Sequence, residues 1–374
     1  MNITTDQLTV AEYFAGIGLV RMGLEPCGWR VIFANDISEK KYEMYQTFFP
    51  DAKQHYKIAD VFDLDGADIP TTTMATCSFP CVDLSLAGNM TGINGKHSSA
   101  FWGFLKILKR QQNAAPKIIL IENVPGWLYS NSGNDFRITV QALNQLGYAC
   151  DVFILDALRF TPQSRQRVFL IGAKTAASDT TLEQIAQRSY FLSSKTLRKT
   201  LSANRDLKWF YIDLPAPPPL RSNGLAAIIE LLSDDDSRWW SEDEVMRHFN
   251  MMSKAHHQMV TMLIDNSHIN YRTFYRRKRH DRQRAEVRSD EIAGCLRTAI
   301  GGSGKQFLIK AGNGQLKMRT MTPREYARLQ GVPEHYPISA NGIQALTGFG
   351  DAVCVPVIKW IAQHALNPLL NNLL

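Results

Sequence analysis

The chain has 374 residues, of which 45% are hydrophobic and 21% are charged. This balance is typical of a soluble globular protein with one large and one smaller domain. The net charge of +7 favours a polyanionic partner without establishing one. No apolar run is long enough to cross a bilayer, and the amino terminus lacks a basic-then-apolar signal pattern. We therefore expect a cytoplasmic protein with no membrane partner.

Short β-rich runs alternate with amphipathic stretches through the first half of the chain. The run 118–121 is apolar on both faces, as a strand buried in a parallel sheet requires. Strands are predicted at 8–14, 29–34, 73–77, 118–121 and 168–172, and helices at 19–24, 39–48 and 101–108. The alternation predicts βαβ units and an α/β fold with a doubly wound, mostly parallel sheet.

Regular periodicity weakens after Ala173. The following stretch contains a proline-rich segment at 215–219 and an acidic run at 234–236. Helical periodicity returns at 322–329 and at 355–366. We therefore expect a catalytic and cofactor-binding domain over 1–174, a smaller irregular domain over 175–335, and a carboxy-terminal segment over 336–374 that packs back on the first domain.

A glycine-containing turn, Phe14-Ala15-Gly16-Ile17-Gly18, joins the first predicted strand to the first predicted helix. Glycines let the backbone approach a ligand closely, and the start of a helix is slightly positive. Arg21 stands where the third glycine of a dinucleotide fingerprint would fall, which weakens a nicotinamide interpretation. Taken alone, the turn fits a purely structural role about as well as a nucleotide site.

Two carboxylates follow predicted strands and strengthen the nucleotide interpretation. Asp36 ends the second strand, where a carboxylate can accept hydrogen bonds from both hydroxyls of a ribose. Asp60 follows a third predicted strand, where it could accept from an adenine amino group. Either one alone is best explained as a solvated strand end, but the two together behind a glycine turn favour adenosine binding.

The tetrapeptide Ser78-Phe79-Pro80-Cys81 places a cysteine just after a predicted strand. An isolated cysteine is more often a buried structural residue. Here Pro80 fixes the direction in which the chain leaves the strand, and the glycines that follow indicate a mobile segment. Glu122-Asn123-Val124 ends the next strand at the sheet edge where ligands bind in this architecture. Cys81 is therefore a candidate nucleophile.

The remaining cysteines indicate neither disulfides nor metal. The six cysteines are scattered along the chain, which does not suggest a disulfide framework. Cys77 and Cys81 form the only close pair, and no second pair completes a zinc site. We expect no bound metal.

The ordered set of motifs resembles the DNA (cytosine-5) methyltransferases of prokaryotic type and covers most of the chain. The matching segments are Phe14–Gly18, Asp36, Asp60, Phe79–Cys81, Glu122–Val124, Gln163–Arg167, Arg324–Gly331 and Gly350–Val353. The resemblance implies methyl transfer from S-adenosylmethionine to C5 of a cytosine flipped out of double-stranded DNA within a short specific sequence. It also implies a covalent intermediate between Cys81 and C6, and S-adenosylhomocysteine as the product.

The resemblance assigns roles to four side chains. Cys81 would be the nucleophile, and Glu122 would hold the amino group and N3 of cytosine. Arg165 would contact the ring carbonyl and stabilise the developing charge. Arg167 would position the site or touch DNA, and the spacing of the two arginines on a strand predicts that both point to one face.

The resemblance further implies cofactor and DNA contacts. The cofactor would lie against Phe14, Ala15, Gly16, Ile17, Gly18, Asp36, Ile37, Asp60, Val61, Pro80, Asp351 and Ala352. The segment 89–99 resembles the family's closing loop, and its glycines suit a lid. Two residues depart from the family pattern, since Val82 stands where glutamine is common and Asp351 replaces the usual asparagine.

A basic cluster lies between Arg272 and Arg288, with aromatic residues interleaved. Basic runs are usually solvated faces, but this one is internal and precedes a glycine-rich turn suited to a phosphate backbone. The predicted DNA contacts are Ser85, Arg276, Arg277, Arg279, Arg297, Gly301, Gly302 and Ser303. We expect a monomer that binds double-stranded DNA, with a restriction endonuclease as a functional partner.

Four other classes of protein compete with this interpretation. An RNA cytosine methyltransferase shares the chemistry, although the large recognition region favours DNA. An amino-methyltransferase would carry an Asp/Asn-Pro-Pro-aromatic motif, which the chain lacks. A catalytically dead DNA-binding protein would be expected to lose Cys81 or Glu122. A nicotinamide oxidoreductase gives no role to Cys81.

Overall fold

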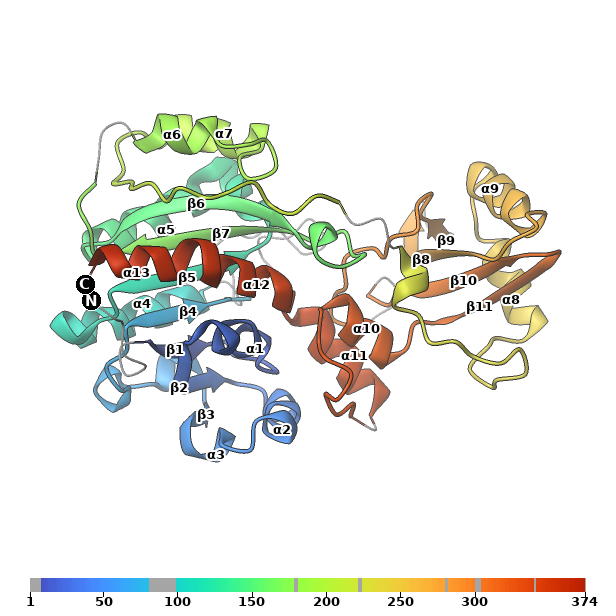
Figure 1. Cartoon of the computed structure of the whole chain (residues 1–374), viewed down its shortest axis with the longest axis horizontal. Coiled ribbons are helices and arrows are strands. Elements are labelled where there is room, and N and C mark those ends of the chain that lie inside the picture. Colours follow the sequence, from blue (N-terminus) through green and yellow to red (C-terminus); the bar gives the residue numbers. More distant parts are fainter. Residues whose placement is uncertain are drawn as a thin grey trace. The chain divides into compact units, whose positions relative to one another are not determined.

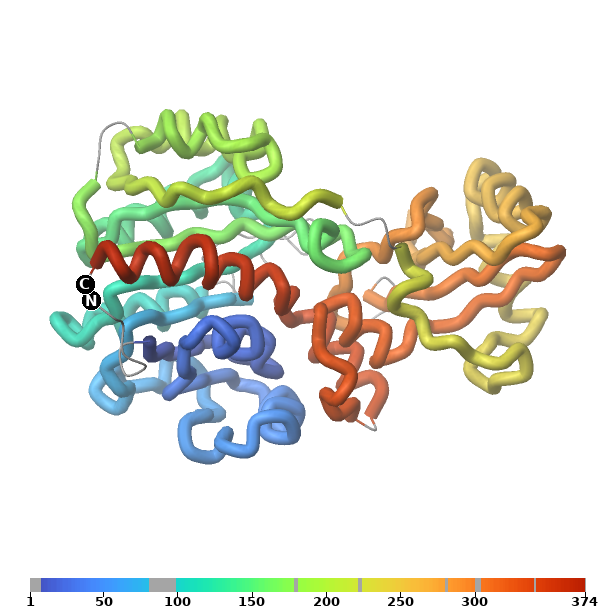
Figure 2. Tube along the Cα trace, in the orientation of Figure 1, coloured from blue at the N-terminus to red at the C-terminus, as the bar shows by residue number. Residues whose placement is uncertain are grey.

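The computed structural model describes residues 8–80, 99–177, 181–220, 224–279, 282–299, 304–339 and 341–373. The chain forms two compact units. The first contains Met1–Asp156, Gln166–Pro217 and Val355–Leu374, and the second contains Ala157–Arg165 and Pro218–Cys354. The path of the chain through each unit can be followed by colour in Figure 2.

A seven-stranded sheet forms the centre of the first unit (Figure 1), in the order β3-β2-β1-β4-β5-β7-β6. The strands are β1 (Thr9–Tyr13), β2 (Arg30–Asp36), β3 (Tyr56–Ile58), β4 (Met74–Cys77), β5 (Ile118–Asn123), β6 (Ala149–Asp156) and β7 (Gln166–Ala173). All neighbours pair in parallel except β7, which is antiparallel to both β5 and β6. The predicted α/β fold with a doubly wound, mostly parallel sheet is confirmed.

Helices cover both faces of this sheet. They are α1 (Leu19–Leu24), α2 (Glu39–Phe48), α3 (Ala52–His55), α4 (Ala100–Gln111), α5 (Asn134–Gln145), α6 (Thr181–Gln187), α7 (Lys195–Ser202), α12 (Val355–Ile361) and α13 (Asn367–Leu373), with a π-helical turn at Ala362–Leu366. On one face, Tyr13 of β1 meets Phe104 of α4 with 5.0 Å between ring centroids. On the other, α1 and α12 pack so closely that a Cβ on Gly23 would lie 2.6 Å from Ile358.

The first unit extends beyond the predicted boundary at residue 174. Residues 175–217 return to the sheet, where Trp209 is 2% exposed and bridges to Cys150 of β6. Arg188 also forms a buried ion pair with Asp151 of β6. At its other end the second unit runs to Cys354, so residues 336–354 belong to it and not to a separate terminal segment. Burial of Trp209 explains why the first unit extends past residue 174. The weak periodicity of residues 175–217 did not indicate this burial.

The second unit is more regular than the sequence suggested. Its four-stranded antiparallel sheet has the order β11-β10-β8-β9. Its elements are α8 (Glu242–Phe249), α9 (Lys254–Ile264), β8 (Asn270–Arg279), β9 (Arg282–Val287), β10 (Phe307–Gly312), β11 (Gln315–Thr320), α10 (Pro323–Leu329) and α11 (Gly342–Asp351). Trp240, His248, Phe274 and Phe307 stack together on this sheet, with 5.0 Å between the ring centroids of the two phenylalanines.

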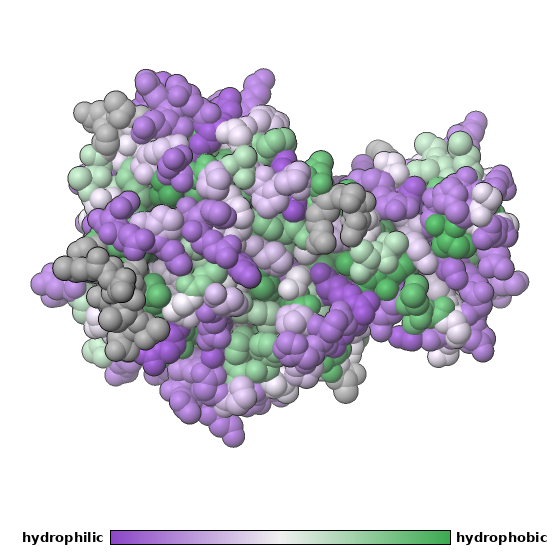
Figure 3. Space-filling view, viewed as in Figure 1, coloured by the Kyte–Doolittle hydropathy of each residue, from purple (hydrophilic) through white to green (hydrophobic). Residues whose placement is uncertain are grey.

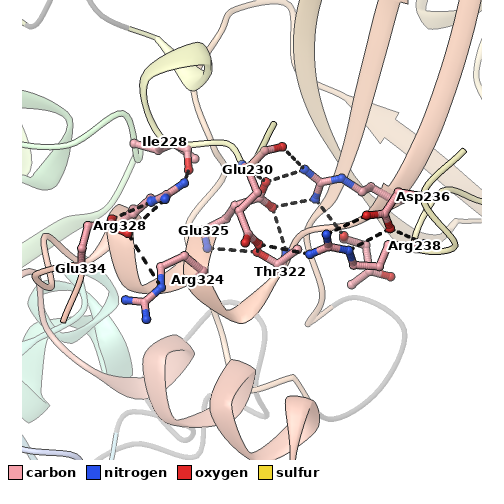
Figure 4. A network of polar contacts seen from close by, with 11 residues as sticks. Ile228, Glu230, Asp236, Arg238, Thr322, Arg324, Glu325, Arg328 and Glu334 are labelled. Atoms are coloured by element: carbon pink, nitrogen blue, oxygen red, sulfur yellow. Dashed lines mark hydrogen bonds and ion pairs between the residues drawn. The ribbon is translucent and has the colours of Figure 1, made fainter. Parts of the chain in front are cut away.

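A buried ion pair connects β11 to α10 in the second unit, and Figure 4 labels its carboxylate, Glu325. Arg319 donates to Glu325 at 2.8 Å, and their side chains are 1% and 0% exposed. Glu325 also accepts from the backbone of Thr322 at 2.8 Å and of Glu230 at 2.9 Å, and it completes a capping box at the start of α10. Burial of two charges is tolerated here because each has several hydrogen-bond partners.

The visible surface of each unit mixes hydrophilic side chains with small hydrophobic patches (Figure 3). Among the described residues, the helical stretch Gly342–Leu373 is long and apolar enough to cross a membrane, but 72% of its apolar window is buried in the structure. Core helices of water-soluble folds have the same composition. We therefore assign this stretch to packing within the two units.

Candidate active site

The turn after β1 has a backbone that requires its glycines. Gly16 and Gly18 have φ of +57° and +82°, and a Cβ on Gly18 would lie 2.5 Å from Phe49. Phe14 also has a positive φ, of 58°, which is uncommon for a large side chain. Such strained backbone gathers at functional sites. The conformation of Phe14 is a signal that the sequence did not reveal.

Residues of β2 and β3 hold this turn in place. The backbone N–H of Gly16 donates to the Asp36 carboxylate at 3.1 Å, and the Tyr56 hydroxyl donates to the Gly16 carbonyl at 3.1 Å. The Asn35 side chain donates to the carbonyls of Lys57 and Ala59 at 3.0 and 2.9 Å. The structure thus brings the predicted glycine turn and the predicted Asp36 together at the carboxyl end of β1 and β2.

Asp36 has one further backbone contact, and an apolar side chain stands beside it. Its second oxygen accepts from Ser38 N–H at 2.9 Å, and the carboxylate oxygens still have lone pairs for other donors. Ile37 is 67% exposed. Asp60 caps the short turn that follows β3 by accepting from Phe62 N–H at 3.0 Å, and the neighbouring Val61 is buried.

This arrangement fits an adenosine. A carboxylate with free lone pairs suits ribose hydroxyls, and an exposed aliphatic side chain next to it offers a surface for a flat base. Ala15 and Ile17 belong to the turn itself, and both are buried. No group of three or more metal-ligating side chains occurs in the described part of the chain.

Arg21 ties the glycine turn to the outer helices. From α1, its guanidinium donates to Asp51 at 2.9 Å and to Glu25 at 2.6 Å, and it lies 4.1 Å from the centroid of the Phe49 ring. Arg21, which stands where a dinucleotide fingerprint would have its third glycine, therefore contacts several surrounding side chains. The spacing argument did not predict this structural role. Sequence reasoning also missed Glu12 of β1, which is 1% exposed and has no hydrogen-bond partner for either oxygen among the described residues.

Cys81 lies outside the described residues, as do Val82, Ser85 and the segment 89–98. The residues leading up to Cys81 are described. Phe79 is 2% exposed, packs against Phe101 at 5.3 Å between centroids, and its carbonyl accepts from the Asn123 side chain at 3.4 Å. The chain therefore leaves β4 from an anchored phenylalanine next to the end of β5.

Burial separates Cys77 and Cys150 from a nucleophilic role. Cys77 is fully buried, and burial raises the pKa of its thiol well above the usual value. Cys150 is buried as well, and burial raises the pKa of that thiol too. A thiol held protonated in the core is a poor nucleophile, so neither competes with Cys81.

Glu122 and Arg167 form an ion pair between β5 and β7. Arg167 Nε lies 2.9 Å from Glu122 Oε1, and the two side chains are 14% and 13% exposed. The pairing register explains the contact, because Glu122 faces Phe169 across the strands and Arg167 is two residues from Phe169 on the same face. Arg167 also donates to the Gln166 carbonyl at 2.8 Å.

Arg165 differs from the expectation that it shares a strand face with Arg167. It precedes β7, belongs to the second unit and is 4% exposed. Its guanidinium donates to the carbonyls of Leu296 at 2.9 Å and Ala352 at 2.6 Å. The strand begins only at Gln166, so the alternation of side chains does not extend back to Arg165.

Gln163 joins the same buried cluster in the second unit. Its side chain donates to the Leu329 carbonyl at 2.9 Å and accepts from Leu296 N–H at 3.1 Å. Gln330 donates to the carbonyls of Phe349 and Ala352 at 2.6 and 3.0 Å. These motif residues therefore organise the interior of the second unit.

The other predicted site residues of the second unit have varied surroundings. Asp351 is exposed and accepts from the Thr298 hydroxyl at 2.5 Å, so the carboxylate that replaces the usual asparagine has a partner. Arg297 is exposed, and its carbonyl would lie 2.1 Å from a Cβ on Gly350. Gly301, Gly302 and Ser303 lie outside the described residues.

Comparisons with known proteins agree with this geometry. The family model of C-5 cytosine-specific DNA methylases matches residues 8–367. Type II methyltransferase M.DsaV of Dactylococcopsis salina is 26% identical over 367 residues, covering 96% of this chain and 86% of the relative. Type II methyltransferase M.Bsp6I of Bacillus sp. (strain RFL6) is 25% identical, covering 97% of this chain and 100% of the relative. The solved structure of the Dnmt2 methyltransferase of S. pombe has a likeness of fold, with a TM-score of 0.62 at 19% identity, covering 97% of this chain and 99% of that one.

Proposed function

The chain belongs to the C-5 cytosine-specific DNA methylases, and on that premise we propose that it methylates C5 of a flipped cytosine within a short specific sequence of duplex DNA. The observation that carries the proposal is the ion pair between Glu122 and Arg167 at the sheet edge, next to the Asn123 contact that anchors Phe79. The target atoms are inaccessible inside a duplex, so the base must leave the stack at a cost of a few kcal/mol.

S-adenosylmethionine supplies the electrophilic methyl group when bound. In our proposal its adenosine lies at the turn after β1, where Asp36 binds the ribose hydroxyls and Asp60 the adenine amino group. Ile37 covers the base, and this assignment is supported by its exposure and by the lone pairs left on Asp36. The remaining cofactor contacts that we propose are Phe14, Ala15, Gly16, Ile17, Gly18, Val61, Pro80, Asp351 and Ala352.

Cys81 provides the nucleophile. Cytosine C5 is a poor nucleophile, but addition of the Cys81 thiolate to C6 converts C5 into an enamine-like carbon that takes the methyl group. A free thiol has a pKa of about 8.5, so the step requires local stabilisation of the thiolate. Loss of the C5 proton to water then restores the ring double bond and expels the Cys81 thiolate, which balances atoms and charge.

Glu122 and Arg167 stabilise the negative charge that this addition creates on the cytosine ring. Glu122 holds the amino group and N3 of cytosine, where a proton is placed or shared as negative charge builds up. We assign the contact with the ring carbonyl to Arg167 rather than Arg165. The ion pair with Glu122 supports this change, and both terminal nitrogens of Arg165 donate to backbone carbonyls of the second unit.

The biological setting follows from the relatives. Several are named Type II methyltransferases, which supports a role in DNA modification beside a restriction endonuclease. We propose that the protein acts as a monomer in the cytoplasm, where it meets DNA at the nucleoid.

Trapping of a covalent adduct tests the chemistry. DNA with 5-fluorocytosine at the target has no C5 proton to lose, so the wild-type protein should form a denaturant-resistant adduct when S-adenosylmethionine is present. Cys81→Ala should lose both the adduct and methyl transfer while retaining DNA binding. Cys77→Ala is the matched control and should retain both. An adduct in Cys81→Ala would refute the assignment of the nucleophile.

A further inference from the structure

A turn between α6 and α7 presents two aromatic side chains at the surface of the first unit. Tyr190 and Phe191 are 67% and 55% exposed, and their ring centroids lie 6.5 Å apart. The residues on either side of them are bound to the edge strand β6. Arg188 forms its buried ion pair there, and the Leu192 carbonyl accepts from Ile154 N–H at 2.9 Å. The two rings therefore lie on a turn that is hydrogen-bonded to the sheet on both sides.

Helix α7, which follows this turn, carries a cationic face. Lys195, Arg198 and Lys199 are three or four residues apart, so they share one side of the helix, and the opposite side is buried. The Arg198 guanidinium reaches back to the turn and donates to the Arg188 carbonyl at 3.1 Å. The cationic face and the two rings are therefore neighbours. We call this set the edge surface: Tyr190, Phe191, Lys195, Arg198 and Lys199.

The charges of α7 oppose the stability of the helix itself. Lys195 occupies its first position, where the helix dipole favours a carboxylate, and the first turn has no acidic residue. Lys195 and Lys199 are like charges four residues apart, which destabilises a helix. No ion pair involves Lys195, Arg198 or Lys199 within the part of the chain that the structure describes. An anionic partner would therefore relieve repulsion that the protein leaves in place.

Exposed rings beside these cations match one kind of polyanion. Proteins bind single strands by stacking bases on aromatic rings while basic side chains follow the phosphates. A duplex keeps its base faces inside the stack, and an acidic peptide matches the charges but offers the rings no flat partner. We propose that the edge surface binds single-stranded DNA, with bases stacked on the two rings and phosphates against the cations. DNA is the expected source because the chain belongs to a family that acts on DNA.

The edge surface is separate from the candidate active site. Strand β6 is the last strand of the sheet, and β7 lies between it and β5, which carries Glu122. The glycine turn follows β1, which lies beyond β5 and β4. Figure 1 shows α6 and α7 beside β6. The proposed binding therefore adds a second nucleic-acid site to the first unit and depends on neither base flipping nor methyl transfer.

Binding of labelled oligo(dT) in the presence of saturating unlabelled duplex DNA tests the proposal. Oligo(dT) has no cytosine to be methylated, and the duplex occupies the substrate site. Tyr190→Ala/Phe191→Ala should weaken binding at least about fivefold, the lower end for loss of one stacked base, with the salt dependence unchanged. Lys195→Gln/Lys199→Gln should lower the log–log salt slope by about 1.4, which is about 0.7 for each phosphate.

Lys106→Gln/Lys109→Gln is the matched control, because it removes two exposed lysines from α4 of the same unit. It should leave both the affinity for oligo(dT) and the salt slope nearly unchanged. The edge-surface variants should melt no lower than the wild type and should methylate duplex DNA at the wild-type rate, since their side chains are exposed and lie away from the active site.

Four results would overturn the proposal. They are wild-type binding of oligo(dT) by Tyr190→Ala/Phe191→Ala, an equal loss in the α4 control, equally tight binding of polyglutamate, and tighter binding of oligo(U), which would assign the surface to RNA. Slower methylation of duplex DNA by the edge-surface variants would overturn it too, because the surface would then serve the substrate. Failure of the wild-type protein to methylate duplex DNA bears on the proposed function alone, so the two failures are distinguishable.

Discussion

Breaking the buried pair of Arg319 and Glu325 should destabilise the second unit strongly. Arg319→Met leaves the Glu325 carboxylate buried without its cation, and removal of one partner of such a pair costs about 3–5 kcal/mol. Glu325→Met leaves the Arg319 guanidinium buried without its anion. It also removes the capping box of α10, which adds about 1 kcal/mol to the loss of stability. The double variant removes both charges and should cost only about 1–2 kcal/mol, mainly from the cap and the lost backbone contacts.

Urea unfolding followed by circular dichroism measures these differences, and hydrogen exchange in β10 and β11 assigns them to the second unit. The exposed pair of Arg328 and Glu334, also drawn in Figure 4, serves as the control. Glu334→Gln should cost less than about 1 kcal/mol. If the double variant loses as much stability as the two single variants together, the two charges act independently and the reasoning is refuted.

Four further substitutions test other parts of the structure. Burial raises the pKa of Glu12 to about 8, so stability should fall as pH rises from about 4.5 to 8, and urea midpoints of Glu12→Gln should lack that decline. Gly350→Ala places a Cβ 2.1 Å from the Arg297 carbonyl oxygen, and the overpacking should lower the unfolding free energy of the second unit by about 3 kcal/mol. Arg165→Gln should lower the melting temperature, whereas Arg167→Gln should slow methyl transfer by more than its effect on the melting temperature explains, since it removes the partner of Glu122; undiminished methyl transfer by Arg167→Gln would contradict our assignment.

Local signals explain which elements were predicted well. The bounds of α1 and α2 agree with the prediction to the residue. Gly18, in the left-handed conformation, immediately precedes α1, and Ser38 caps α2 by accepting from Lys41 N–H. Glycine turns and serine caps act over three or four residues, so they are visible in a sequence.

The second unit was harder to predict because its stability comes from contacts distant in sequence. The aromatic core unites Trp240 and His248 with Phe274 and Phe307, and no short-range periodicity links them. The end of β8 carries consecutive charges, which resemble a loop when the partner strand is unknown. Trp209 likewise joins the first unit only through tertiary packing, which is why the domain boundary was placed too early.

In the candidate site, too, local motifs were visible in the sequence and tertiary contacts were not. Motif order was sufficient to select Asp36, Glu122 and Arg167, and the structure brings the last two into contact. Spacing alone did not reveal that the strand begins after Arg165, so the prediction placed both arginines on one strand face. The buried carboxyl of Glu12 gave no sequence signal, because one acidic residue in an apolar strand has no motif around it.

Identification of the methylated base tests the central claim most directly. Duplex DNA of mixed sequence would be incubated with the purified protein and S-adenosylmethionine carrying a labelled methyl group, then digested to nucleosides and separated. Our account predicts that the label appears in 5-methyldeoxycytidine and that Cys81→Ala incorporates none. Label in N4-methyldeoxycytidine or N6-methyldeoxyadenosine, or undiminished labelling by Cys81→Ala, would contradict it.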